Sequence, residues 1–75
     1  MLVVKVNGET KNFDGTEVRV ARVRAAFTLD DLGRETGIQV SELSRYERNR
    51  QVPSDGHLVK LLAFAPDCLK EVTRD

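Results

Sequence analysis

The chain has 75 residues, 40% of them hydrophobic, which suits one small domain near the lower size limit for a self-sufficient core. Its 12 Lys and Arg residues balance 12 Asp and Glu residues, so net charge gives no general argument for nucleic acid as a partner. The single cysteine, Cys68, excludes an internal disulfide and suits a reducing compartment. No signal peptide is evident and the apolar runs are too short to cross a bilayer, so we expect a cytoplasmic protein with no membrane role.

Residues 1–13 have the pattern of a β-hairpin. The segment LVVKV is rich in β-branched residues, and Asn7-Gly8 after it is a strong signal for a two-residue hairpin turn. That turn predicts the cross-strand pairs Val6 with Glu9, Val4 with Lys11, and Leu2 with Phe13. The apolar members of these pairs share one face, which must pack on the rest of the chain because an isolated hairpin is only marginally stable.

The chain from residue 16 onward is predicted to be helical. A first helix should cover residues 17–26, with Thr16 as its N-cap. A second helix should begin at Thr28, where the hydroxyl and the Asp31 carboxylate can form a capping box, and should end near Glu35.

Gly37 supplies the backbone freedom for a sharp turn into a third helix over residues 40–48. A fourth helix should follow Ser54 as N-cap, with its inward side made of Leu58, Leu61, Leu62 and Phe64. A short helical turn over residues 68–72 is expected to close the chain. We therefore expect one domain over 1–75, with 1–14 as a β-hairpin accessory and 16–75 as the helical part.

The second and third predicted helices have the spacing of a helix-turn-helix. Gly33 is small enough to let the third helix approach, and Ile38 and Leu43 can fill the space between the two helices. The opposite face of the third helix is then left outward, with Val40, Ser41, Ser44, Arg45 and Arg48. Such a face suits the major groove of DNA, since serine can bond base edges, arginine can fork onto guanine and valine can touch a thymine methyl. A plain solvated surface would have a similar composition.

The segment TLDDLGRETGIQVSELSRYERNRQVPS, residues 28–54, resembles the helix-turn-helix of the XRE family, which includes the lambdoid phage repressors and Cro proteins. The pattern matches without a gap at Leu32, Gly37, Leu43, Ser44, Arg45, Glu47, Pro53 and Ser54. The resemblance extends to roughly residues 17–64. It implies a mainly α, compact, four- to five-helix, lambda-repressor-like helix-turn-helix domain, here preceded by an N-terminal β-hairpin. It also implies sequence-specific binding of double-stranded DNA, most often as a homodimeric repressor on a palindromic operator.

The resemblance implies roles for individual residues. Those that fall where relatives read bases are Val40, Ser41 and Arg45. Those that fall at or near backbone contacts are Gln39, Glu42, Ser44, Arg48, Asn49 and Arg50. Glu42 is expected to point an acid toward the groove, where it could accept from a cytosine amine or repel wrong sites. Arg22 and Glu47 match an arginine and a glutamate that form an internal ion pair in relatives.

This sequence departs from the family pattern at three positions. Leu29 replaces a polar residue that in relatives caps the second helix against a phosphate, so one positioning contact is expected to be missing. Gln39 is a poor N-cap where Ser or Thr is usual. Asn49 stands in place of the usual glycine, and asparagine tolerates the left-handed backbone that this turn requires.

Two surfaces compete for the expected homodimer contact. The hairpin could pair its edge with a second copy, lay its apolar face on a partner, or simply cover the flank of the first helix as extra core. The end of the fourth helix and the last helical turn could instead meet their twins through Leu62, Phe64, Leu69 and Val72.

Other function classes fit the sequence less well. His57, the only histidine, is expected to be a solvated polar residue and Cys68 a small core residue, and no catalytic set, phosphate loop or metal-ligand spacing is present. We therefore expect no enzyme, metal, cofactor or small-molecule ligand. The main alternative is a protein-interaction module, antitoxin-like or partner-binding, which uses the same fold without reading DNA. Phage repressor, antitoxin and chromosomal regulator all stay open.

Overall fold

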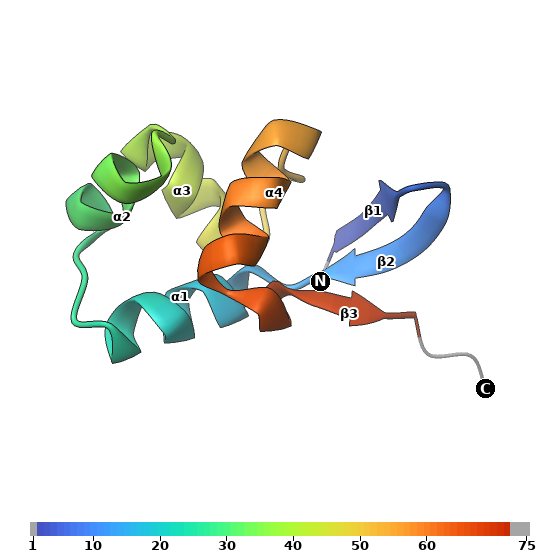
Figure 1. The fold of residues 1–75 in the computed structure, drawn as a ribbon, viewed down its shortest axis with the longest axis horizontal. Coiled ribbons are helices and arrows are strands. Elements are labelled where there is room, and N and C mark those ends of the chain that lie inside the picture. Colours follow the sequence, from blue (N-terminus) through green and yellow to red (C-terminus); the bar gives the residue numbers. More distant parts are fainter. Residues whose placement is uncertain (1, 73–75) are drawn as a thin grey trace.

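A three-stranded antiparallel sheet and four α-helices make up residues 2–72, the part of the chain that this computed structural model describes (Figure 1). The expected hairpin included Met1, which lies outside the described residues. The elements follow one another as β1 (Leu2–Val6), β2 (Glu9–Phe13), α1 (Gly15–Arg24), α2 (Leu29–Thr36), α3 (Val40–Glu47), α4 (Asp55–Phe64), a 3-10 turn (Pro66–Cys68) and β3 (Leu69–Glu71). The helices gather on one side and the sheet projects from the other. A mainly α fold with an N-terminal hairpin is confirmed.

The β1–β2 hairpin has the predicted register. Leu2 lies opposite Phe13, Val4 opposite Lys11 and Val6 opposite Glu9. Asn7 and Gly8 both have positive φ, 53° and 81°, as a two-residue turn between right-twisted strands requires.

The helical turn predicted over residues 68–72 is wrong, because Leu69–Glu71 within that range form strand β3. Pro66 begins a short 3-10 turn instead of continuing α4, and the chain then runs antiparallel to β2 with Leu69 opposite Phe13. The backbone N–H of Asp14 donates to the carbonyl of Cys68 (2.7 Å), and Lys11 forms an ion pair with Glu71 across the strands. The sheet therefore joins the two ends of the described chain.

Helix α1 begins two residues earlier than predicted, and its N-cap is Asp14 instead of Thr16. The Asp14 carboxylate accepts from the backbone N–H of Thr16 (3.1 Å). A carboxylate is also favoured there by the positive end of the helix dipole. At the other end, Ala26 has φ 58°, and the N–H of Phe27 donates to the carbonyl of Arg22 (3.0 Å), which closes the helix.

The predicted caps of α2 and α4 are confirmed. Thr28 and Asp31 form a reciprocal capping box, with hydrogen bonds of 3.1 and 2.9 Å. Gly37 ends α2 in the left-handed conformation, φ 73°, and Ser54 caps α4. Gln39 precedes α3 without a side-chain cap hydrogen bond, as the departure from the family pattern predicted.

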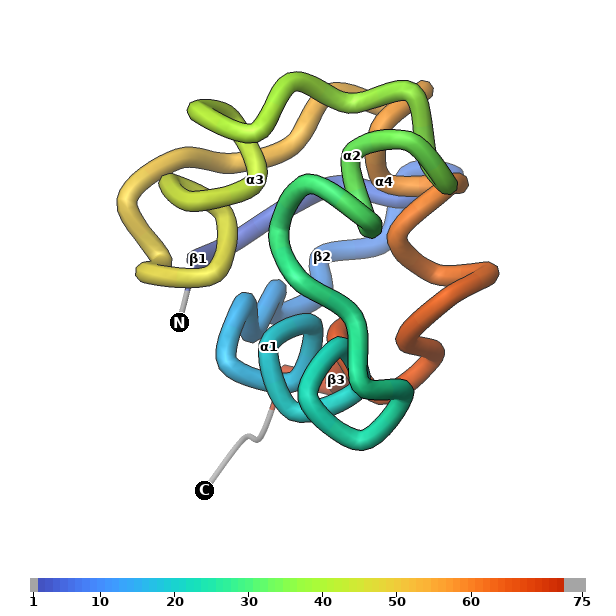
Figure 2. The backbone as a smooth tube through the Cα atoms, turned by 90° about the vertical axis from the view of Figure 1, so that its left-hand side faces the viewer, coloured from blue at the N-terminus to red at the C-terminus, as the bar shows by residue number. Residues whose placement is uncertain are grey.

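The core contains residues of all four helices and of strands β1 and β2. Figure 2 shows the backbone of these elements from the side on which the helices gather. The largest fully buried side chains of the core are Tyr46, Phe13, Leu32, Leu43, Leu61, Val18 and Cys68. Tyr46 packs edge-on against Phe13, with ring centroids 6.4 Å apart. The third helix is thereby fixed directly to the sheet, so its orientation depends on both the helices and the hairpin.

Candidate nucleic-acid interface

Helices α2 and α3 meet closely because Gly33 has no side chain. A Cβ at Gly33 would lie 3.1 Å from the carbonyl oxygen of Ile38 and 3.3 Å from Val40 Cγ2. In the turn itself, the Thr36 hydroxyl donates to the carbonyl of Leu32 (2.7 Å) and accepts from the N–H of Ile38 (3.3 Å). The sequence reasoning did not identify Thr36, which satisfies backbone groups on both sides of the turn.

Helix α3 has one buried and one exposed face. Leu43 and Tyr46 are buried in the core, while Val40, Ser41 and Arg45 are exposed. The three side chains to which the resemblance gives base-reading roles are therefore exposed to solvent. The remaining members of the candidate set are distributed around them, with Gln39, Arg48 and Arg50 exposed and Ser44 and Asn49 half-buried.

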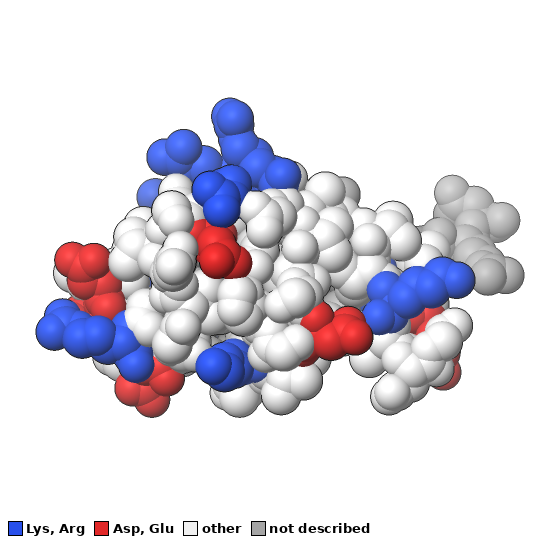
Figure 3. Space-filling model, turned by 90° about the horizontal axis from the view of Figure 1, so that it is seen from above, with Lys and Arg blue, Asp and Glu red and all other residues white. Residues whose placement is uncertain are grey.

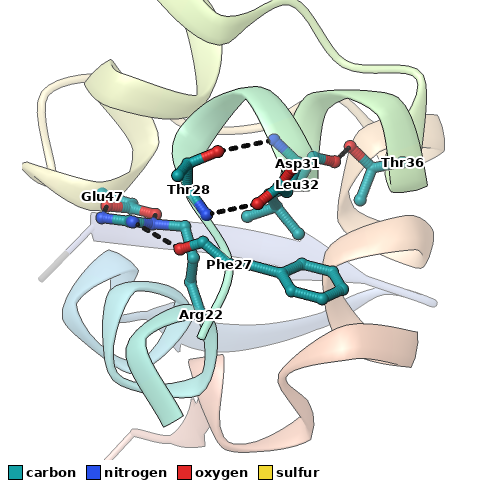
Figure 4. Close-up of polar contacts among 7 residues, drawn as sticks. All are labelled: Arg22, Phe27, Thr28, Asp31, Leu32, Thr36 and Glu47. Atoms are coloured by element: carbon teal, nitrogen blue, oxygen red, sulfur yellow. Dashed lines mark hydrogen bonds and ion pairs between the residues drawn. The ribbon is translucent and has the colours of Figure 1, made fainter. Parts of the chain in front are cut away.

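Arg22 and Glu47 form an ion pair between α1 and α3 (Figure 4). Arg22 Nε donates to Glu47 Oε2 (2.8 Å) and Nη2 donates to Oε1 (3.1 Å), while Nη1 donates to the carbonyl of Phe27 (3.0 Å). The Glu47 side chain is only 6% exposed. The hydrogen bonds to Glu47 raise the pKa of the Arg22 guanidinium above its ordinary value. This pair holds the end of α3 against α1 and leaves both charges satisfied.

Asn49 reverses the chain after α3 and ties it to α1. It has φ 58°, the left-handed conformation expected at this position, and its Oδ1 accepts from the N–H of Gly15 (2.7 Å). Gly15 itself lies against α3, since a Cβ there would be 1.6 Å from the carbonyl oxygen of Tyr46. No residue near Gly15 along the chain predicts this approach. Arg48 and Arg50, on either side of Asn49, are exposed.

Arg45 contacts a residue that the sequence reasoning did not identify. Its Nε donates to Gln51 Oε1 (2.6 Å), and the N–H of Arg50 donates to the Arg45 carbonyl (2.9 Å). Gln51 is half-buried in the loop before α4.

The Glu42 carboxylate, expected to point toward a DNA groove, makes its contacts within the fold. Glu42 Oε2 accepts from the Tyr46 hydroxyl (3.2 Å) and lies 3.3 Å from His57 Nδ1. The Tyr46 hydroxyl is also 2.8 Å from that nitrogen. The cause is the helical spacing, since residues four apart lie on the same side of a helix. Burial, followed by the Glu42 carboxylate, raises the pKa of Tyr46.

His57 was expected to be a solvated polar residue, which was wrong. Its side chain is 28% exposed and its ring packs edge-on against Tyr46, with centroids 5.9 Å apart. It therefore links α4 to α3.

Positive side chains gather along one edge of the molecule, on the side where α3 and the loop after it lie (Figure 3). The exposed arginines of this region are Arg45, Arg48 and Arg50. A protein of zero formal net charge thus has a local site for a polyanion.

Two helices joined by a tight turn, the second with an exposed face of serine, valine and arginine, define a helix-turn-helix DNA-binding domain. A family model described as a helix-turn-helix domain matches residues 15–65, and the chain belongs to that family. The matched region runs from the start of α1 to just past α4 and leaves the sheet outside it. No curated protein and no solved structure was found to match the chain. Within residues 2–72, no helix has the length and apolar character needed to cross a membrane.

Proposed function

We propose that this protein is a sequence-specific transcription regulator of the XRE, Cro-like type, acting as a homodimeric repressor on a palindromic operator. One observation carries the proposal. The exposed face of α3 holds Val40, Ser41 and Arg45, while the packing of the helix is completed by residues on its other side. Side chains able to read base edges are therefore not needed for folding.

The exposed face of α3 contacts the bases, and residues around that face contact phosphates and position the helix on the DNA. Arg45 can donate two parallel hydrogen bonds to guanine, Val40 can contact a thymine methyl and Ser41 can bond a base edge. Gln39, Ser44, Arg48 and Arg50 surround them, and phosphate contacts there would fix the helix in the groove. Asn49 supports this arrangement through its bond to Gly15, which holds the loop between the two flanking arginines.

A dimer is required for useful affinity. A single module of this kind buries only about 600–1,000 Å² on DNA, and the basic surface here is limited to a few arginines. Of the two candidate interfaces, the hairpin is better supported. Leu69 lies opposite Phe13 in the sheet and Phe64 stacks on Phe27 (5.6 Å between centroids), so two of the four C-terminal candidates already make contacts within this fold. Strand β1 is an edge strand of the described sheet, as β3 also is, and its Val3 side chain is 60% exposed.

Selection of bound sequences from a random duplex pool at two salt concentrations tests the proposal. The expected result is a palindromic motif with half-sites about one helical turn apart. Zero formal net charge favours one alternative, a protein-interaction module. Failure to enrich any sequence at either salt concentration would support that alternative and contradict DNA reading.

Two substitutions separate base reading from phosphate contact. Arg45→Ala should cost about 1–3 kcal/mol on the selected site and relax the preference at one position per half-site. Arg48→Ala should weaken binding to selected and random duplexes alike and reduce the salt slope by about 1. Titrations of both variants on both duplexes measure this difference. Equal losses on the two duplexes for Arg45→Ala would contradict its base-reading role.

A further inference from the structure

We infer that Gln51 is a specificity-determining residue that acts through Arg45, by holding its guanidinium in the orientation that reads a base. This inference rests on the proposed DNA-binding function and assigns a residue outside α3 to its recognition surface. The observation behind it is the hydrogen bond from Arg45 Nε to Gln51 Oε1, 2.6 Å long.

The backbone brings these two residues together. After α3 the chain reverses at Asn49, whose left-handed conformation is anchored by the bond from the N–H of Gly15. The N–H of Arg50 then donates to the Arg45 carbonyl (2.9 Å), so that residue 51 returns beside the last turn of the helix. Pro53, two residues further on, is buried and limits the freedom of the loop. Gln51 is thus held by the fold, while Arg45 is exposed and held mainly by Gln51.

The bonded atom decides what Arg45 can do. A guanidinium has five N–H donors in a planar fork, and Gln51 takes the one on Nε. The two terminal nitrogens, Nη1 and Nη2, carry a parallel pair of donors that the bond to Gln51 does not use. Bidentate recognition of guanine O6 and N7 uses such a parallel pair. Gln51 therefore leaves Arg45 able to bind guanine end-on, through Nη1 and Nη2. It prevents side-on binding, which would use Nε and one terminal nitrogen.

The charge of the group that contacts Arg45 also affects DNA binding. Glutamine is a neutral acceptor, so it fixes the guanidinium without cancelling the charge that faces the DNA. Neither acid of α3 competes for Arg45, because Glu42 contacts Tyr46 and His57 and Glu47 is paired with Arg22. Because an exposed arginine otherwise loses rotamer freedom on binding, a partner that orders it in advance lowers the cost of forming the complex.

The test compares four proteins on duplexes that carry the selected motif, single-base changes of it, or random sequence. These proteins are the unchanged chain, Gln51→Ala, Arg45→Ala and the double variant. Gln51→Ala should weaken binding to the motif by about threefold to tenfold and relax preference at the same base pair as Arg45→Ala. Random-duplex affinity and the salt slope should not change, because no charge is removed. In the Arg45→Ala background, Gln51→Ala should have no further effect.

Two matched controls isolate the effect. Val52→Ala alters the neighbouring exposed side chain of the same loop and should leave specificity unchanged. Gln51→Ala combined with Arg48→Ala should give additive losses, because Arg48 is not bonded to Gln51 in the described structure. Without DNA, the Nε–H of Arg45 should exchange with solvent more slowly in the unchanged protein than in Gln51→Ala.

The outcomes separate the inference from the proposed function. If the unchanged protein selects a motif but Gln51→Ala binds it equally well, the inference alone fails. If Gln51→Ala costs the same with and without Arg45, Gln51 contacts DNA directly and positioning is refuted. If the unchanged protein selects no motif at all, the proposed function fails and the inference falls with it.

Discussion

Glu47→Ala should destabilise the fold strongly because it removes the only carboxylate that pairs with Arg22 among the described residues. The two hydrogen bonds between them are 2.8 and 3.1 Å long, and the side chains are only 15% and 6% exposed. Breaking a buried ion pair by removing one partner costs about 3–5 kcal/mol, because the remaining charge is left uncompensated. Arg22 keeps its bond to the Phe27 carbonyl, so we expect the lower end of that range.

A loss of about 3 kcal/mol corresponds to a fall in Tm of roughly 12–24 °C for a domain of this size. Thermal unfolding followed by circular dichroism measures this fall, and urea unfolding gives the free energy independently. Glu35→Ala, at an exposed position of α2, is the matched control and should change Tm by only a few degrees. A Glu47→Ala Tm within about 2 °C of the unchanged protein would refute the reasoning.

The double variant Arg22→Met/Glu47→Leu tests the physical cause. If the penalty comes from an unpaired charge, replacing both residues with apolar ones should recover most of the stability that Glu47→Ala loses. If the double variant is as unstable as Glu47→Ala, the loss comes from packing between α1 and α3 and not from the buried guanidinium.

Other features of the fold allow further predictions. Gly15→Ala should cost more than about 3 kcal/mol, because its Cβ would lie 1.6 Å from the Tyr46 carbonyl oxygen; near-native urea unfolding would contradict this close approach. Ala26→Gly should stabilise the protein by about 0.5–1 kcal/mol, since φ is 58° there; an unchanged or lower Tm would show that strain is not stored at this turn. Burial raises the pKa of the Cys68 thiol to about 11, so native protein should resist a thiol reagent at pH 8 and react only as it unfolds. Because the unfolded thiol ionises near pH 9.0, this residue should also lower stability as pH rises from about 9 to about 11; rapid labelling of folded protein would contradict its burial.

The sequence predicted the features that depend on neighbours along the chain. The Asn7-Gly8 turn fixes the hairpin register, the Thr28–Asp31 capping box starts α2, and Gly37 ends it. Each of these depends on residues only a few positions apart. The helix-turn-helix itself follows from such local signals plus the resemblance, which also led to the contact between Arg22 and Glu47.

The features that the sequence did not predict depend on residues far apart. Strand β3 looks like the end of a helix until Leu69 is placed beside Phe13, and a lone histidine looks solvated until His57 is placed beside Tyr46. The role of Gly15 depends on a carbonyl at residue 46, so it has no local signature. For Gln51 a hint exists, since an asparagine in the left-handed turn two residues earlier implies that the chain returns toward α3. The candidate site was thus predictable in its outline but not in the contacts that orient its side chains.

Strand β3 has a consequence for how the protein is made. It pairs with β2 across a separation of almost the whole described chain, since Lys11 lies opposite Glu71. Contacts of such high sequence separation form late, because the cost of closing a long loop comes before any gain from pairing. On the ribosome, α1 to α4 emerge before the strand that completes the sheet. Until that strand arrives, the outer edge of β2 is open to other strands, so nascent chains crowded on one messenger can mispair through an edge that β3 covers in the folded protein.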